Sequence, residues 1–353
     1  MLWGKINAIF FRYDIMIMRS FMKKSIFSFL SISLFSVFMI SCTEKKAAKP
    51  VTLIMAEVNP ESSLCGQMDL AFKEKVEELS NGSIIVDLRC SGVLGDESQI
   101  LKQMFDKDDN SIQLARVSAN LSSYGATKSK LINIPYTFSN SEHFWTFATS
   151  DLAKEILTEP YTKNLGVRGL CYAEEGFRNF FMTQKLTKVE DFQGKKMRVS
   201  GQILTSLADS LQAEPVKIPF TDLFLAMQTG QVEVADQPIS NYLSNSLYKA
   251  APYMIQDGHM LGGVQIIISS AAWDSLTEKQ QQIIEESALY AANILRIKGE
   301  EFEQKAISQM QAEGVEFIPV KDIDSWRKAS KKVITELSKD YPEIYQQILD
   351  MNK

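Results

Sequence analysis

The sequence predicts an α/β fold with two lobes. Its 353 residues exceed the length of a typical single domain, which favours two. Apolar residues make up 45% of the chain and charged residues 23%, a balance typical of globular proteins with substantial cores. Strand-like and helix-like patterns also alternate along the chain, as they do where helices cover a parallel sheet.

A first strand–helix–strand unit is predicted over residues 51–90. Residues 51–58 form a short β-type run, and residues 83–90 alternate between apolar and polar side chains, which predicts a strand with one buried face. Between them, apolar residues recur at spacings of three and four, as on one face of a helix: Leu64, Met68, Phe72, Val76 and Leu79. Asn81–Gly82 ends this helix because both residues tolerate a positive φ. Together these elements predict a βαβ unit.

The alternation continues through the middle of the chain. The patterns predict helices over residues 96–106, 142–160, 204–211 and 221–228, and strands over 112–117, 167–172 and 195–199.

One unusually long helix is predicted near the C-terminus. Thr277 and Gln280 form a capping box, and a helical period follows from about Glu278 to Glu313. Such a helix can cross two lobes and brace both, although the pattern is equally consistent with a helix broken near Lys298–Gly299. The remaining elements are a strand over 315–320 and a last helix within 321–350.

The N-terminus has the pattern of an export signal. Two lysines precede an uncharged run from Ile26 to Ile40, which ends in a small serine. At about 15 residues the run is shorter than the roughly 20 that span a bilayer comfortably. Residues 1–41 are therefore predicted to be a signal peptide, with Met18 or Met22 a plausible true start. An uncleaved anchor helix is the alternative, and either arrangement places the body outside the cytoplasmic membrane.

Cys42 resembles the lipidated cysteine of bacterial lipoproteins. Phe38–Ser41 is a loose version of the lipoprotein box, with Met39 where leucine is more usual. The resemblance implies a lipid anchor on Cys42 and a polar tether over residues 42–50.

The other cysteines are Cys65, Cys90 and Cys171, which allow at most one internal disulfide. A Cys65–Cys90 bridge is conceivable, and three buried thiols are the favoured interpretation. The sequence has no CxxC pair and no Cys/His cluster, so no metal site is expected.

The charge distribution argues against a nucleic-acid partner. The formal net charge is −5, and five of the basic residues precede Ser25, so the body is more acidic than the whole chain. Nucleic-acid binding requires a concentrated Lys/Arg face, which the sequence does not offer. The acidic net charge does not exclude a small anionic ligand, because a pocket can be locally positive on an acidic protein.

Arg198 is the strongest candidate for a ligand contact. It lies between Met197 and Val199 in a predicted strand that follows the turn 190–194. A guanidinium in such a place either extends to the surface or is buried, where it needs an anion. Its planar fork can donate two parallel hydrogen bonds to a ligand carboxylate. From the residues alone, an internal ion pair is an equally good interpretation.

A set of motifs over residues 176–238 carries a family resemblance. Their order is Gly176–Phe177–Arg178, Asp191 through Val199, Ala226–Met227–Gln228–Thr229–Gly230 and Asp236–Gln237–Pro238. In order and spacing they resemble the solute-binding subunit of TRAP (tripartite ATP-independent periplasmic) transporters, the DctP family. Weaker similarity extends over about residues 51–340.

The resemblance implies a two-lobed fold like that of type II periplasmic binding proteins, with strands that cross the hinge and a long helix that spans both lobes. The expected lobe I comprises residues 51–175 and 263–303, and lobe II comprises residues 176–262 and 304–353.

The resemblance also assigns roles to site residues. Arg198 holds the principal carboxylate of the ligand, and Arg178 gives a second positive contact. Gln237 stands where the family often has an asparagine that binds the same carboxylate, and Phe220 forms an apolar wall.

Three further residues fall near the expected site. Asp96 and His259 fall at positions that can approach the ligand or its waters. Arg116 is expected either to meet a second carboxylate of a dicarboxylic acid or to pair with a surface acid.

The implied function is extracytoplasmic binding of a small organic acid and its delivery to the large and small membrane subunits of a TRAP transporter, with no cofactor. A ligand sensor that serves a receptor is the alternative. An enzyme is disfavoured, because His143 and His259 are the only histidines and no Gly-x-Ser-x-Gly motif is present. C4-dicarboxylates, 2-oxo acids, sugar acids and amino-acid-like acids all stay open as ligands.

Overall fold

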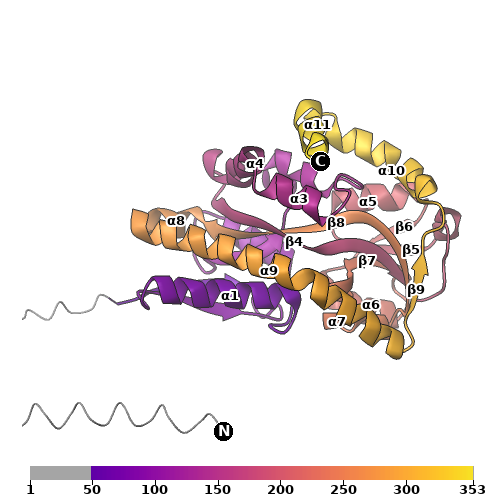
Figure 1. The fold of residues 1–353 in the computed structure, drawn as a ribbon, viewed down its shortest axis with the longest axis horizontal. Helices are drawn as coiled ribbons and strands as arrows, with labels where there is room; N and C mark the ends of the chain where they lie inside the picture. The colour runs from indigo at the N-terminus through magenta and orange to yellow at the C-terminus, as the bar shows by residue number, and fades with distance from the viewer. Residues whose placement is uncertain (1–48, 353) are drawn as a thin grey trace, which may run out of the picture. The chain divides into compact units, whose positions relative to one another are not determined.

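A mixed nine-stranded sheet runs through residues 49–352, the part of the chain that the computed structural model describes (Figure 1). The strand order is β2-β1-β3-β8-β4-β7-β5-β6, and β9 pairs with β8 outside this path. The strands are β1 Val51–Ala56, β2 Ile84–Arg89, β3 Leu114–Ser118, β4 Val167–Met182, β5 Lys196–Val199, β6 Glu214–Lys217, β7 Val234–Pro238, β8 Tyr253–Ser269 and β9 Glu316–Pro319. The predicted signal peptide and Cys42 lie outside the described residues.

Strands β4 and β8 connect the two halves of the sheet. The first half of β4 pairs with the end of β8, which in turn pairs with β3. The second half of β4 lies between β7 and the start of β8. The register of β4 and β8 shifts between Glu174 and Phe177, where Gly176 has a φ of +96°. A bulge of this kind bends a strand. Two long strands therefore cross between the lobes, as expected.

Helices cover both faces of the sheet in lobe I, the half that contains β1, β2 and β3. The helices of this lobe are α1 Leu64–Leu79, α2 Glu97–Phe105, α3 Ser141–Ala148, α4 Asp151–Thr162 and α8 Ser270–Ser275. Side chains alternate between the two cores: Leu114 packs with α1 and α3, and Ala115 packs with α2. The single helix expected over residues 142–160 is two helices, because the Ser150 side chain accepts from the N–H of Ala153 and starts α4 anew.

Lobe II, the half that contains β5, β6 and β7, has the same layered arrangement. Its helices are α5 Gln202–Ser210, α6 Leu223–Gln228, α7 Ile239–Ser244 and α10 Ile323–Ser338. Phe180 packs toward α5 and α10, whereas its neighbour Phe181 packs toward α6 and α7. Because successive side chains of a strand point to opposite faces, β4 contributes apolar side chains to the cores on both faces of this lobe.

Helix α9, Glu278–Ala312, spans both lobes as one unbroken helix of 35 residues. The predicted capping box at Thr277 is present. Ile284 and Leu295 belong to the core of lobe I, Ala306 belongs to a core of lobe II, and Phe302 packs against both. In Figure 1, α9 runs beside α1 and reaches α7. The long helix predicted from the sequence is therefore confirmed.

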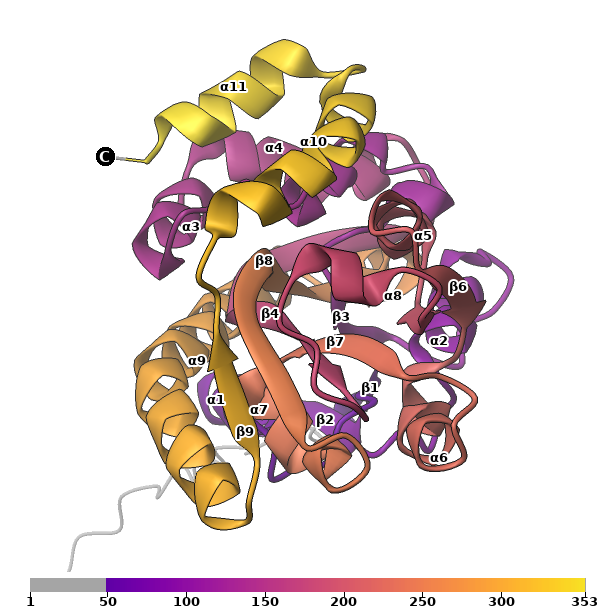
Figure 2. The same ribbon diagram turned by 90° about the vertical axis from the view of Figure 1, so that its right-hand side faces the viewer.

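The C-terminal segment returns to lobe I. The single last helix expected within residues 321–350 is two helices, α10 and α11, and α11 spans Pro342–Asp350. Tyr345 and Ile348 join the core of lobe I, and the carbonyl of Ile348 lies 2.7 Å from Nε2 of His143. Figure 2 shows α11 above α3 and α4. We therefore propose a lobe boundary that differs from residues 304–353 by assigning α11 to lobe I.

Replacement of Gly299, in the middle of α9, tests the bracing role of this helix. Gly299→Ala is expected to raise the free energy of unfolding by about 0.5–1 kcal/mol, because glycine is a poor helix former. The added Cβ would lie 3.9 Å from Cδ2 of Leu64, an ordinary contact. Gly299→Pro is the opposing control and should cost about 3 kcal/mol or more. Urea unfolding measures both, and a destabilised alanine variant would contradict a rigid continuous helix.

Candidate functional site

Arg198 is a buried cation whose partners include no carboxylate. It lies on β5, its exposed fraction is 3%, and its Nε donates to the carbonyl of Ile218 over 3.0 Å. Among residues 49–352, no acidic side chain forms an ion pair with it. Burial lowers the pKa of Arg198 to about 10, although Asp236 acts in the opposite direction. The guanidinium is thus desolvated and available to an anion.

Arg178, on the adjacent part of the site, is already paired. Its Nε lies 2.5 Å from Oδ2 of Asp236, and its Nη2 donates to the backbone carbonyl of Asp236 over 2.8 Å. Burial raises the pKa of this completely buried aspartate, but Arg178 and His259 together outweigh burial and hold the pKa well below its usual range. Strand register places the pair: Arg178 on β4 is opposite Pro238 on β7. Arg178 and Asp236 together bring no net charge to the site.

His259 supports the same aspartate from β8. Its Nδ1 lies 2.8 Å from Oδ2 of Asp257 and its Nε2 lies 3.4 Å from Oδ2 of Asp236. The imidazole stacks on the ring of Phe180, with centroids 4.1 Å apart. Burial lowers the pKa of His259, but the two carboxylates outweigh it and raise the pKa to about 9. The imidazolium therefore holds Asp236 in place.

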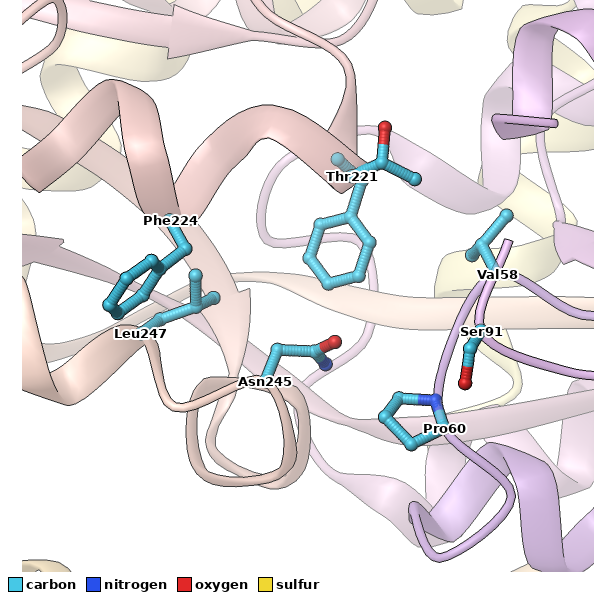
Figure 3. Close-up of a pocket in the computed structure, with 8 residues that line it drawn as sticks. Val58, Pro60, Ser91, Thr221, Phe224, Asn245 and Leu247 are labelled. Carbon is cyan, nitrogen blue, oxygen red and sulfur yellow. The ribbon is translucent and has the colours of Figure 1, made fainter. Parts of the chain in front are cut away.

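The other two residues with predicted ligand contacts in lobe II are Gln237 and Phe220. Gln237 is buried on β7, and its Oε1 accepts from Nδ2 of Asn241 over 3.4 Å. Phe220 lines a cavity of about 200 Å³, and its role as an apolar wall of the ligand site stays a prediction. Figure 3 shows Phe224 and Leu247 on one side of this cavity and Val58, Ser91 and Pro60 on the other. The complete lining is Val58, Pro60, Ser91, Phe220, Thr221, Phe224, Asn245 and Leu247.

Asp96 is the N-cap residue of α2. Its carboxylate accepts from the N–H of Gln99 over 2.9 Å, and the side chain of Gln99 accepts from the N–H of Asp96 in return. The next residue, Glu97, is an acid whose charge acts on both site arginines, in addition to the stronger effect of Asp236. Ser118 donates to Glu97 through its backbone N–H over 3.1 Å and through its hydroxyl over 2.7 Å. Sequence reasoning missed Glu97, since two adjacent acids at a helix start give no sign of which one caps it.

Arg116 pairs with an internal acid rather than a surface acid. Its exposed fraction is 4%, its Nε lies 2.6 Å from Oε2 of Glu57, and its Nη2 donates to the other oxygen. Glu57 also accepts from the backbone and side-chain nitrogens of Asn59. The Glu57–Arg116 pair is electrically neutral and completely internal. The predicted contact between Arg116 and a second ligand carboxylate would require Glu57 to give up this partner.

The cysteines of the described residues are free thiols, so the conceivable Cys65–Cys90 bridge is absent. Cys65 and Cys171 are buried, as the favoured interpretation states, whereas Cys90 is partly exposed. Across the described chain, no three His, Cys, Asp or Glu side chains group closely enough to hold a metal ion. Within residues 49–352, no helix combines the length and the apolar character of a membrane span.

Comparison with known families shows to which family this chain belongs. The family model described as "bacterial extracellular solute-binding protein, family 7" (DctP) matches residues 55–340. The chain belongs to this family. It is thus a TRAP transporter solute-binding protein, as the motifs over residues 176–238 indicate.

Individual relatives agree with this assignment. This DctP-family protein is 26% identical to the C4-dicarboxylate-binding periplasmic protein DctP of Shewanella loihica, over 81% of this chain and 85% of that one. A TRAP solute-binding protein of Pseudomonas putida with bound D-glucuronate superposes with a TM-score of 0.80 at 23% identity, over 84% and 96% of the two chains. A relative from Shewanella oneidensis with bound succinate gives 0.80 at 22%, over 86% and 100%. These structures confirm the two-lobed α/β fold.

The imidazolium of His259 should make stability depend on pH. Because its pKa is raised from 6.5 to about 9, its contribution is complete below pH 6.5 and is lost as the pH rises through about 9. We expect the difference in unfolding free energy between wild type and His259→Gln to shrink by ~3 kcal/mol across that interval. Urea unfolding of both proteins at several pH values measures it. Parallel pH profiles would show that the folded protein holds His259 neutral.

Proposed function

We propose that this protein captures a small organic acid through Arg198 and delivers it to the membrane subunits of a TRAP transporter. The observation that carries the proposal is the buried guanidinium of Arg198, whose contacts within the described chain include no carboxylate. A desolvated cation is unfavourable unless an anion compensates it. A carboxylate accepts two parallel hydrogen bonds from such a fork.

The surrounding pairs support a single open position for an anion. Asp236 forms an ion pair with Arg178 and lies 3.4 Å from Nε2 of His259, and within the described chain no ion pair joins it to Arg198. Gln237 on the same strand offers an uncharged amide. The site would therefore offer a ligand one charge–charge contact, at Arg198, with an uncharged amide of Gln237 on the neighbouring part of the sheet.

Contacts between the lobes support capture by closure. Nδ2 of Asn245, in lobe II, donates to Oδ1 of Asn59, in lobe I, over 3.1 Å. A Cβ on Gly92 would lie 3.1 Å from the side chain of Thr221, so the two lobes approach closely at this point. Closing lobes exclude water, and the lower local dielectric strengthens an arginine–carboxylate pair. The related TRAP proteins with bound succinate and D-glucuronate also hold carboxylates.

Arg198→Ala should weaken ligand binding roughly 30- to several-thousand-fold, since loss of a buried charged partner costs about 2–5 kcal/mol. Calorimetric titration with an acid found by a thermal-shift screen measures the change. Arg89→Ala is the matched control, because Arg89 lies on β2 with a half-exposed side chain paired to Asp87. An Arg198→Ala variant with the affinity of wild type would exclude the clamp.

The leader supports a further part of the proposal, attachment of the mature protein to the membrane through Cys42. The apolar run to Ile40 and the small Ser41 precede this cysteine, and the polar residues 43–50 lead to β1. A diacylated cysteine would hold the body outside the cytoplasmic membrane, within reach of the transporter.

Cys42→Ser is expected to move the protein from the membrane fraction to the soluble extracytoplasmic fraction, because acylation requires the thiol. Cell fractionation and immunodetection measure the distribution. Cys90→Ser, a change in the folded body, should leave the protein in the membrane fraction. Retention of Cys42→Ser with the membrane would instead support an uncleaved anchor helix.

A further inference from the structure

We infer that the site selects acids with one carboxylate and a small apolar body over dicarboxylates and polyhydroxylated acids. The inference deepens the proposed function and rests on Arg198 as the clamp. Two features of the described residues carry it: the cations near the site other than Arg198 are each paired with an internal acid, and five of the eight residues that line the cavity are apolar.

The charge count leaves one cation for a ligand. Arg178 and His259 are matched by Asp236 and Asp257. Arg198 remains, as described above, without an ion pair among residues 49–352.

Arg116, another buried cation, is already paired and is not available to a second carboxylate of the ligand. Arg116 directs two of its nitrogens at Glu57, whose side chain is completely buried. Glu97 adds a negative charge from lobe I that acts on Arg198 and Arg178. A second ligand carboxylate would therefore meet a neutral ion pair and a repelling acid.

The cavity walls favour an apolar ligand body. Phe220, Phe224 and Leu247 come from lobe II, and Val58 and Pro60 come from lobe I (Figure 3). No charged side chain lines this space.

The polar groups of the lining are few. Asn245 is one of them, and its Nδ2 is already shared between Asn59 and the carbonyl of Asn241. The Oδ1 of Asn245 and the hydroxyls of Ser91 and Thr221 remain. Each buried hydroxyl of a sugar acid needs a hydrogen-bond partner, and three side-chain groups satisfy few of them.

Chain connectivity links the cavity to the clamp. The carbonyl that accepts from Nε of Arg198 belongs to Ile218, and Phe220, two residues further, forms the cavity wall. The cavity volume of about 200 Å³ is below the range of about 300–1,000 Å³ typical of drug-sized ligands. Arg198 does not itself line this cavity, so the inference requires that an acid clamped at Arg198 extends its body toward Phe220.

Matched acid pairs test the inference on the soluble protein that begins after Cys42. The pairs are pentanoate with glutarate and 4-methyl-2-oxopentanoate with 2-oxoglutarate, and D-glucuronate represents polyhydroxylated acids. Calorimetry should give an affinity at least about tenfold higher for the monocarboxylate of each pair, because the second carboxylate is buried without a partner. D-Glucuronate should also bind at least about tenfold more weakly than the better monocarboxylate.

The outcomes separate the inference from the proposed function. Tighter binding of glutarate, 2-oxoglutarate or D-glucuronate, lost in Arg198→Ala, overturns the inference and retains the carboxylate clamp. Equal affinities within a pair also overturn the inference. If none of the five acids binds, both the inference and its basis in Arg198 are rejected for acids of this size.

A variant of the cavity wall provides a second test. Phe224→Arg adds a cation to the wall and should shift the glutarate-to-pentanoate affinity ratio at least about tenfold toward glutarate. Phe224→Leu, the control, keeps the wall apolar and should leave the ratio within about threefold of wild type. Thermal unfolding verifies that both variants are folded. A ratio unchanged by Phe224→Arg would show that ligands do not reach this wall.

Discussion

The electrostatics of this protein depend on the burial of Arg198 without an internal carboxylate. Taking a guanidinium out of water costs several kcal/mol, and only a nearby anion recovers that cost. Here burial already lowers the pKa of Arg198, so the protein holds this charge at the expense of its own stability. An anionic ligand that binds the folded form would restore stability by mass action. Binding and stabilisation are then the same event.

Asp236 explains why Arg198 can remain unmatched beside a buried acid. Arg178 and His259 both approach the same oxygen of this carboxylate, and Asp257 in turn approaches the imidazole. Strand pairing makes the arrangement rigid, since β4, β7 and β8 lie side by side in the sheet. Both cations approach Oδ2, whereas the buried Oδ1 of Asp236 has no hydrogen-bond partner among the described residues, and no ion pair joins this carboxylate to Arg198.

Local sequence patterns predict the parts of the fold that depend on periodicity. The bounds of α1 and the cap of α9 follow from apolar spacing and from Thr277 and Gln280. The long strand β8 carries no such signal, because it is buried along most of its length and contains three glycines rather than alternating residues. Its place between β3 and β4 is a tertiary property.

The site shows the same division between local and tertiary information. The motif positions identify Arg178 and Arg198, but not which arginine is already paired. That difference depends on Asp236, which lies 58 residues from Arg178 in sequence. Likewise, Arg116 meets Glu57 across 59 residues, and no local pattern connects them. The sequence therefore identified Arg178 and Arg116 as candidate contacts but did not identify the acids with which they form ion pairs.

Glu57 belongs to a hydrogen-bonded chain that reaches from Arg116 to the opposite lobe. Asn59 donates to Glu57 with its backbone and side-chain nitrogens, and its side-chain oxygen accepts from Asn245 of lobe II. The side chain of Asn59 thus contacts both Glu57, the partner of Arg116, and Asn245 of the opposite lobe. When the lobes are closed, Asn59 is oriented from both sides, and Glu57 is kept on Arg116. In the function that we propose, closure of the lobes would therefore be linked to the Glu57–Arg116 pair through one hydrogen-bonded chain.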